Sequence, residues 1–366
     1  MPIFVTKPTV PPIDEYIEEI RPIFESRMLT NMGPVYKKLQ LELKDYLGVG
    51  HVSMFTNGHL ALEVAVHALD LRRPEGEVIT TSYTFLSTTN AIVRNGLKPV
   101  FCDIRPSDYT MDPERIEELI TEKTVAIMPV HVYGNICDVE RIEAIAEKHG
   151  LKVIYDAAHA FGETYNGVGV GNFGDASMFS FHATKVFNTV EGGCVTYNDP
   201  AYARALHELK NYGIFDGEDA EYIGGNAKMD EFRAAMGLCN LRHIDESIAS
   251  RKAAHDRYFK RLSGVSGITL CPTQEGVEPN YAYFPALFDE RLFGKSRDDV
   301  LRSLKEHEIY ARRYFFPAVN DMTCYRDWPG APTPISHETS LRILCLPLYE
   351  GLSVEDVDRI CDVILK

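Results

Sequence analysis

From about residue 50 the chain alternates between two hydrophobic patterns. Short apolar, β-branched runs typical of buried strands are followed by segments in which apolar residues recur every three or four positions, as in amphipathic helices. The strand-like runs are residues 51–55, 77–81, 98–104, 124–132, 151–158 and 176–181. The helical segments between them are residues 59–71, 85–96, 113–121 and 139–150. This alternation predicts an α/β fold with a mostly parallel sheet covered by helices on both faces.

The pattern changes in the last third of the chain. Residues 230–262 read as one long helical stretch, followed by a strand-like run at 281–288 and helical patterns at 297–308 and 353–366. Ser353, with Asp356 three residues later, is a plausible start for the last helix. We predict a large domain over residues 1–240 and a smaller C-terminal α/β domain over 241–366. A helical segment at 13–26 is expected to pack on one of them.

Composition narrows the class of protein. The 366 residues are 45% hydrophobic and 25% charged, which is ordinary globular composition, and the formal net charge is -15. That charge argues against nucleic acid or anionic membranes as partners, although it leaves room for a local basic pocket. No apolar run approaches the roughly 20 residues of a membrane span, and the N-terminus lacks a signal-peptide pattern, so we expect a cytoplasmic protein.

The eight cysteines form no CxxC pair and no short cluster with histidine. We therefore expect neither a metal site nor a disulfide framework, and most of the cysteines should be core residues.

Candidate chemistry lies where the predicted strands end, because ligands of such sheets bind beyond the carboxyl ends of the strands. The first strand is followed by Thr56, Asn57, Gly58 and His59. Free amides at a helix N-terminus, with a glycine that admits close approach, form an anion site, although a simple helix cap has the same appearance.

Aromatic residues follow the second strand, at Tyr83 and Phe85. Either ring could stack on a planar ligand, and core packing is the simpler alternative. Asp156 ends a later apolar strand, and His159 follows it. A carboxylate there either caps a local turn or pairs with a protonated ring nitrogen of a ligand that His159 could also cover.

Lys185 follows the last strand-like run, with Ser180 and His182 beside it. A desolvated lysine has a lowered pKa, so its amine becomes nucleophilic toward carbonyl groups. A protein that uses pyridoxal 5'-phosphate supplies four groups. They are a lysine that forms an imine, an acid that holds a pyridinium proton, an aromatic ring that stacks on the cofactor, and a phosphate-binding turn. We therefore expect this cofactor.

These motifs resemble those of the DegT/DnrJ/EryC1/StrS sugar aminotransferases. The similarity includes "LTNMGP", "TNGHLAL", "SYTFLSTTNAI", "YDAAHA", "SFHATK", "GGNAKMDEFRAA", "ARRYFFP" and "CLPLYEGLS", and so extends over essentially the whole chain. The resemblance implies an aspartate-aminotransferase-like fold and a homodimer with active sites at the subunit interface.

The resemblance also implies roles for individual residues. The expected catalytic residues are Lys185, which binds the cofactor covalently, and Asp156, which holds its ring nitrogen. The expected cofactor-binding residues are Gly58, His59, Phe85, Asp156, His159, Ser180, Lys185 and, from the neighbouring subunit, Asn226. Relatives often carry a small hydroxyl residue at the position of His59, so we expect its backbone amide to matter more than its ring.

The implied substrates are a nucleotide-linked keto-sugar as amino acceptor and L-glutamate as donor. The segments that match sugar-nucleotide contacts contain Thr30, Asn31 and Met32, and Arg312 and Tyr314. An arginine there either pairs with the pyrophosphate or belongs to a solvated basic turn.

The residues within these motifs are most similar to those of enzymes that aminate C4 of dTDP-4-keto-6-deoxyglucose. Amination at C3 and UDP- or GDP-linked sugars remain alternatives. So do another pyridoxal-phosphate class, such as a lyase or desulfurase, and a non-catalytic binding protein with the same fold.

Overall fold

The computed structural model describes residues 1–366 except 215–216, 327 and 329. Its largest element is a seven-stranded sheet in the order β2-β10-β9-β6-β5-β3-β4. The strands are β2 (His51–Phe55), β3 (Glu77–Thr81), β4 (Lys98–Cys102), β5 (Thr124–Met128), β6 (Lys152–Asp156), β9 (Ala176–Ser180) and β10 (Gly193–Tyr197). Strand β10 is antiparallel to both of its neighbours, and the other pairings are parallel. The predicted mostly parallel sheet is therefore confirmed.

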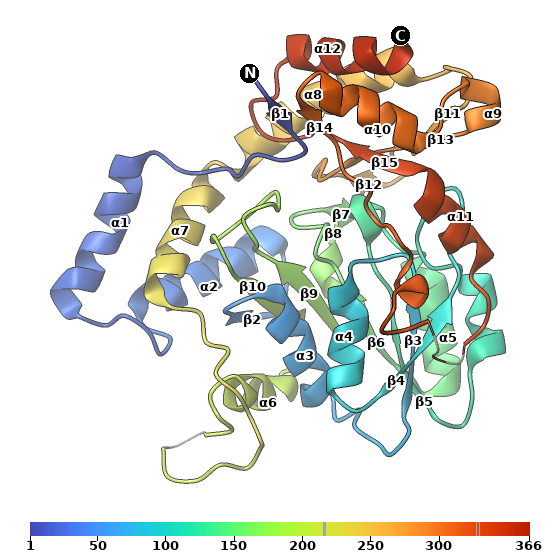
Figure 1. Cartoon of the computed structure of the whole chain (residues 1–366). Helices are drawn as coiled ribbons and strands as arrows, with labels where there is room; N and C mark the ends of the chain where they lie inside the picture. Colours follow the sequence, from blue (N-terminus) through green and yellow to red (C-terminus); the bar gives the residue numbers. More distant parts are fainter. Residues whose placement is uncertain (215–216, 327, 329) are drawn as a thin grey trace.

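Helices cover both faces of this sheet, as Figure 1 shows. Alternate strand residues face opposite layers: Ile154 and Met178 belong to one core cluster, whereas Tyr155 and Phe179 belong to another. The first cluster includes residues of α3 (Gly58–Ala68), α4 (Leu86–Arg94) and α6 (Tyr202–Leu209). The second includes residues of α1 (Ile13–Ser26), α2 (Pro34–Leu47), α5 (Val139–His149) and α7 (Glu231–Arg242).

A separate core forms around a three-stranded antiparallel sheet in the order β11-β13-β15. Its elements are β11 (Ile268–Leu270), β13 (Phe284–Phe288), β15 (Ile343–Leu346), α8 (Ile244–Leu262), α10 (Arg297–Glu306) and α12 (Val354–Leu365). Ile3 of β1 (Ile3–Phe4) joins this core because β1 pairs with β14 (Ile309–Tyr310). The chain therefore begins beside its C-terminal elements (Figure 1).

Helix α8 belongs to both cores. Ile244 packs in the core that contains α7, whereas Ala254, Tyr258 and Leu262 pack in the C-terminal core. The domain boundary placed at residue 240 stays a prediction.

Two helical predictions need correction. Residues 230–262 form two helices, α7 and α8, with a break at His243. Residues 113–121 form two short turns, η1 (Pro113–Arg115) and η2 (Glu117–Leu119), and the chain becomes extended at Ile120 before it enters β5. The start of α12 is confirmed, since the Asp356 amide donates to Ser353 Oγ at 3.0 Å.

The remaining elements are short. They are β7 (Thr164–Tyr165), β8 (Val168–Gly169), β12 (Val277–Glu278), α9 (Glu290–Phe293), α11 (Pro334–Arg342), η3 (Val132–Gly134), η4 (Val170–Asn172) and η5 (Val319–Asp321). Six of the eight cysteines are buried, Cys271 is half-buried and Cys324 is exposed. Within the described part of the chain, no helix combines the length and apolar character needed to cross a membrane.

Candidate active site

A pocket of about 560 Å³ lies at the carboxyl ends of the central strands. It gathers most of the side chains predicted from the sequence. The predicted residues that line it are Gly58, His59, Phe85, Asp156, His159, Ser180, Lys185, Arg312 and Tyr314. Their strands and helices place them there because a parallel sheet brings successive strand ends to one edge.

The turn between β2 and α3 forms one end of the pocket. Asn57 caps α3 by accepting a hydrogen bond from the Leu60 amide at 2.8 Å. A Cβ on Gly58 would lie 2.9 Å from Ser180 Cβ, so only glycine allows the end of β9 to approach this closely. The arrangement leaves helix-terminal amides beside a serine hydroxyl, which suits a phosphate group.

The His59 ring has partners within its own layer of helices. Its Nδ1 lies 3.0 Å from Ser87 Oγ in the first turn of α4, and its Nε2 lies 3.7 Å from Glu63 Oε2. The Nδ1 contact directs the ring toward α4, which leaves the backbone amide at the start of α3 as the group that we expect His59 to offer to an anion.

Asp156 is a buried carboxylate at the end of β6, with 4% of its surface exposed. Thr88 Oγ1 donates to Oδ2 at 2.7 Å, and the Ala158 amide donates to Oδ1 at 3.1 Å. Burial raises the pKa of Asp156, while these two donors and the nearby Lys185 act in the opposite direction. Among the described residues, no cation lies within ion-pair distance of this carboxylate, so a protonated ligand nitrogen could take that place.

His159 is buried over the same pocket. Its ring stacks on Phe315 with an interplanar angle of 2° and a centroid separation of 5.9 Å. The Tyr133 amide donates to Nδ1 at 2.9 Å, so in the neutral ring the proton resides on Nε2. Burial lowers the pKa of His159 well below its usual value, which keeps the ring neutral.

Lys185 reaches the pocket from the loop after β9. Burial lowers the pKa of its amine to about 8, although the Asp156 charge opposes that shift. Its Nζ donates a hydrogen bond to the Tyr283 hydroxyl at 3.3 Å. With this pKa about a tenth of the amine is neutral, and hence nucleophilic, at pH 7, far more than for an ordinary lysine.

The two candidate stacking aromatics have different environments. Phe85 lines the pocket with 59% of its surface exposed, whereas Tyr83 is fully buried and shares a 2.6 Å hydrogen bond with the Tyr133 hydroxyl. On the substrate side, Arg312 is exposed at the pocket and its Nη1 donates to the Tyr314 hydroxyl at 2.5 Å.

Four predicted residues do not line this pocket within the single chain. Thr30, Asn31 and Met32 form a turn before α2 in which Asn31 and Met32 have positive φ angles of 66° and 58°. Asn226 lines a different hollow of about 200 Å³, between α3 and the segment after α6. If these four residues bind cofactor or substrate, they do so in the pocket of another subunit, as predicted for Asn226.

Comparison with known proteins identifies the chain. A model of the DegT/DnrJ/EryC1/StrS aminotransferase family matches residues 13–365. The chain belongs to this family. The predicted family, enzyme class and fold class are thereby confirmed.

Two curated relatives in the family carry the same name. The chain is 43% identical to a dTDP-4-amino-4,6-dideoxy-D-glucose transaminase of Shigella dysenteriae, over 99% of this chain and 98% of that protein. It is 41% identical to the Escherichia coli protein of the same name, over 99% and 97%.

Solved structures of similar proteins have the same fold. DesI, crystallised in the presence of its TDP-sugar product, superposes with a TM-score of 0.95 at 33% identity, covering 100% of this chain and 92% of DesI. Spr1654 of Streptococcus pneumoniae, solved in a PLP form, superposes with a TM-score of 0.92 at 26% identity, covering 100% and 98%.

Sequence reasoning missed three residues that contact the predicted side chains, of which Tyr283 and Phe315 line the pocket. Thr88 holds Asp156, Tyr283 holds the Lys185 amine, and Phe315 stacks on His159. Thr88 lies in the first turn of α4, so its position after a strand end was a usable signal. Phe315 lies in the "ARRYFFP" motif, directly after the predicted Tyr314, so that motif was a usable signal. No local pattern points from Tyr283 to the pocket.

Proposed function

We propose that this protein is a pyridoxal-phosphate-dependent aminotransferase acting on a nucleotide sugar. It transfers the amino group of L-glutamate to C4 of dTDP-4-keto-6-deoxy-D-glucose and yields dTDP-4-amino-4,6-dideoxy-D-glucose and 2-oxoglutarate. The observation that carries the chemistry is a buried lysine of lowered pKa in one pocket with a buried, unpaired carboxylate. The choice of sugar is supported by the relatives at 43% and 41% identity.

The pocket fits the proposed cofactor. The glycine-serine contact at the start of α3 leaves room and amides for the phosphate, and Asp156 has the charge and burial to hold a protonated ring nitrogen. The exposed Phe85 ring is available for stacking. When bound, pyridoxal phosphate withdraws electrons from the carbon that loses its proton and carries the amino group from donor to acceptor.

Lys185 has two tasks in this proposal. Its neutral amine holds the cofactor through the carbonyl carbon, and once displaced by the donor it accepts the proton from the α-carbon of glutamate. The same amine would give up that proton again within the first half, and in the second half it would take up a proton once more and deliver it to C4 of the sugar. Burial raises the pKa of Asp156, and the hydrogen bonds from Thr88 and the Ala158 amide oppose that shift by stabilising the carboxylate.

We place the sugar nucleotide at the open side of the pocket. Arg312 is exposed there, and its guanidinium suits a pyrophosphate because two parallel N–H groups match two phosphate oxygens. Thr30, Asn31 and Met32 are proposed to contact the nucleotide of a neighbouring site.

We further propose a cytoplasmic homodimer with shared active sites. Asn226 lies outside the pocket of its own chain, and Ile223 beside it is 93% exposed. Other large apolar side chains are also uncovered, namely Leu29, Val190 and Tyr212. A second copy of the chain that covers these side chains could also bring Asn226 to the other subunit's phosphate.

A product assay tests the proposed function. Purified protein with pyridoxal phosphate, L-glutamate and dTDP-4-keto-6-deoxy-D-glucose should form 2-oxoglutarate and an amino-sugar nucleotide in equal amounts, measured by mass spectrometry. The Lys185→Ala variant should form neither. Turnover of Lys185→Ala at the wild-type rate would rule out the proposed role of the lysine, and turnover only with another keto-sugar would rule out the proposed substrate.

A further inference from the structure

Tyr283 contacts the Lys185 amine from a segment outside the large sheet. It precedes β13 of the C-terminal core, yet its side chain lines the catalytic pocket. Its hydroxyl accepts a hydrogen bond from Lys185 Nζ at 3.3 Å, and Nζ lies 5.8 Å from the centre of its ring. In the described part of the chain, no other group accepts a hydrogen bond from Nζ.

The Tyr283 ring is held in place by other aromatic rings. Its centroid lies 4.7 Å from that of His159, 5.8 Å from that of Tyr133 and 6.0 Å from that of Tyr314. The interplanar angles of 58°, 58° and 82° correspond to tilted and edge-on contacts, which aromatic pairs favour. The hydroxyl therefore has little freedom to leave the amine.

The backbone that carries Tyr283 is tied to the loop after β6. The Asn280 side-chain amide donates to the His159 carbonyl at 2.9 Å and to the Phe161 carbonyl at 3.0 Å. The Asn280 backbone amide donates to Glu163 Oε1 at 3.0 Å. These bonds fix the segment before β13 to the loop that carries His159.

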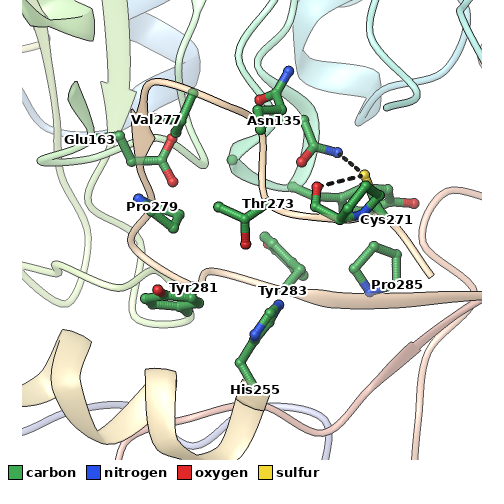
Figure 2. A pocket seen from close by; sticks show the side chains of 14 residues that line it. Asn135, Glu163, His255, Cys271, Thr273, Val277, Pro279, Tyr281, Tyr283 and Pro285 are labelled. Atoms are coloured by element: carbon green, nitrogen blue, oxygen red, sulfur yellow. Dashed lines mark hydrogen bonds between the residues drawn. The ribbon is translucent and has the colours of Figure 1, made fainter. Parts of the chain in front are cut away.

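Behind Tyr283 lies a second, smaller cavity of about 50 Å³. Figure 2 shows Tyr283 between Thr273, His255 and Pro285 in this cavity, with Tyr281 on the same segment. Since Tyr283 lines both cavities, it forms part of the wall between them. Tyr281, in contrast, lines the small cavity and makes no contact with Lys185.

We propose that Tyr283 is a catalytic residue: its hydroxyl holds the Lys185 amine, and the ammonium formed when that amine accepts a proton, while the amine is not bonded to the cofactor. This proposal rests on the proposed aminotransferase function. The amine gains one proton and loses one in each half of the reaction, so Tyr283 exchanges no proton of its own and acts through its oxygen lone pair. Burial raises the pKa of the Tyr283 phenol, which keeps this acceptor neutral.

Tyr283→Phe removes the acceptor and keeps the ring, and Tyr281→Phe on the same segment is the matched control. In Tyr283→Phe, kcat should fall about ten- to a hundredfold, the usual effect of losing a hydrogen bond to a charged group, with each KM within about twofold of wild type. In Tyr281→Phe, kcat and KM should equal those of the wild type.

A second readout needs no cofactor and no turnover. Competitive labelling of Lys185 with acetic anhydride, followed by peptide mass spectrometry across pH 6 to 11, gives the pKa of the amine in the cofactor-free protein. Because the hydrogen bond stabilises the ammonium, the pKa should be lower in Tyr283→Phe than in wild type, and unchanged in Tyr281→Phe.

The proposal is overturned if Tyr283→Phe retains both the wild-type kcat and the wild-type Lys185 pKa. It is also overturned if the two variants behave alike, or if only KM changes. Failure of the proposed function is a different result: the wild-type protein would then form no 2-oxoglutarate from L-glutamate, whatever the labelling shows.

Discussion

At the scale of single residues, burial acts on two groups of opposite charge that line one pocket. It raises the pKa of Asp156 and lowers that of Lys185, so each is shifted toward its neutral form. Their attraction for each other opposes both shifts. For Asp156, Thr88 and a backbone amide add to the stabilisation of the charged form. For Lys185, the Tyr283 hydroxyl is the hydrogen-bond acceptor that stabilises the charged form. The pKa of its amine therefore stays lowered, at about 8, close to the pH at which the amine must react.

Replacing Asp156 with Asn tests the role of the carboxylate. The amide has a similar size and can still accept from Thr88, but it carries no charge to hold a ring nitrogen protonated. We expect kcat to fall about a hundredfold or more, in the range typical of losing a group that governs proton transfer, while cofactor still binds. Steady-state kinetics and cofactor absorbance measure the two quantities, and wild-type kcat in Asp156→Asn would contradict the assignment.

Some site residues could be predicted because they stand just after a predicted strand. Gly58, Asp156 and Lys185 belong to this group, since a parallel sheet collects its strand ends. The choice of Phe85 over Tyr83 came from the resemblance to the family, as did the placement of Arg312 and Tyr314. Tyr283 could not be found in this way, since its contact with Lys185 joins segments 98 residues apart and depends on how the C-terminal core packs.

At the scale of secondary-structure elements, the start of α2 depends on a residue of another helix. Gly33 is the N-cap of α2, and no side chain of its own turn caps it. Glu231, the first residue of α7, is fully buried and accepts from the amides of Gly33 at 3.0 Å and Val35 at 2.8 Å. Its own amide donates to the Leu29 carbonyl at 3.0 Å. One carboxylate thus closes the turn that contains Thr30, Asn31 and Met32.

Glu231→Gln should therefore destabilise the protein. The side-chain amide of the new glutamine has an N–H group where the carboxylate had an oxygen. One of the buried backbone amides at the start of α2 therefore loses its acceptor. We expect the free energy of unfolding to fall by about 2 kcal/mol, as for loss of a helix cap together with a buried hydrogen bond. Chemical denaturation measures this, with the exposed Glu246→Gln of α8 as the control. Equal stabilities of the two variants would contradict the capping role.

A second buried lysine links elements around β2. Lys210 Nζ donates to the Tyr36 hydroxyl at 2.8 Å, to Ser53 Oγ at 2.9 Å and to the Met54 carbonyl at 3.2 Å. Burial, with a smaller contribution from nearby Lys228, lowers its pKa from 10.5 to about 7. The folded protein thus releases this proton near pH 7, whereas the unfolded chain keeps it up to about pH 10.5.

Between those pH values unfolding takes up a proton, so Lys210 makes the folded state gain stability as pH rises. Relative to Lys210→Met, the cofactor-free wild-type protein should become more stable from pH 7 to pH 10, by at most about 1.4 kcal/mol per pH unit. Urea unfolding of both proteins at several pH values gives this difference. A difference that is constant or that shrinks with pH would contradict the lowered pKa.

Local pattern predicted most elements of the large sheet, because short β-branched runs and 3.6-residue periodicity are local properties. Local pattern did not predict the element boundaries and strand directions that depend on tertiary packing. The break at His243 has no glycine or proline to mark it in the sequence. Strand β10 was not predicted, and its antiparallel direction is set by its place between β2 and β9.

At the scale of the whole molecule, the pocket lies where the large sheet meets the segments that lead into the C-terminal core. Strand ends supply Asp156 and Lys185, and the later segments supply Tyr283, Arg312 and Phe315. Asn226 is outside this pocket, so a complete proposed site needs a second copy of the chain.

Mixing two inactive variants tests the shared site. Lys185→Ala removes the amine from its own pocket, and Asn226→Ala removes the side chain proposed to serve the partner's pocket. In a mixed dimer, one pocket combines an intact lysine with an intact asparagine. Unfolding and refolding the two together should therefore restore about a quarter of wild-type activity for random pairing of subunits. Mixtures no more active than the separately refolded variants would contradict a shared site.

The most direct test of the central claim follows the visible absorbance of the purified protein through two additions. The account predicts a band from cofactor bound through Lys185, which L-glutamate should abolish and dTDP-4-keto-6-deoxy-D-glucose should then restore. Lys185→Ala should show no such cycle. A wild-type protein that binds the cofactor but whose absorbance does not respond to L-glutamate would contradict the account, and a response to glutamate without recovery would contradict the proposed sugar.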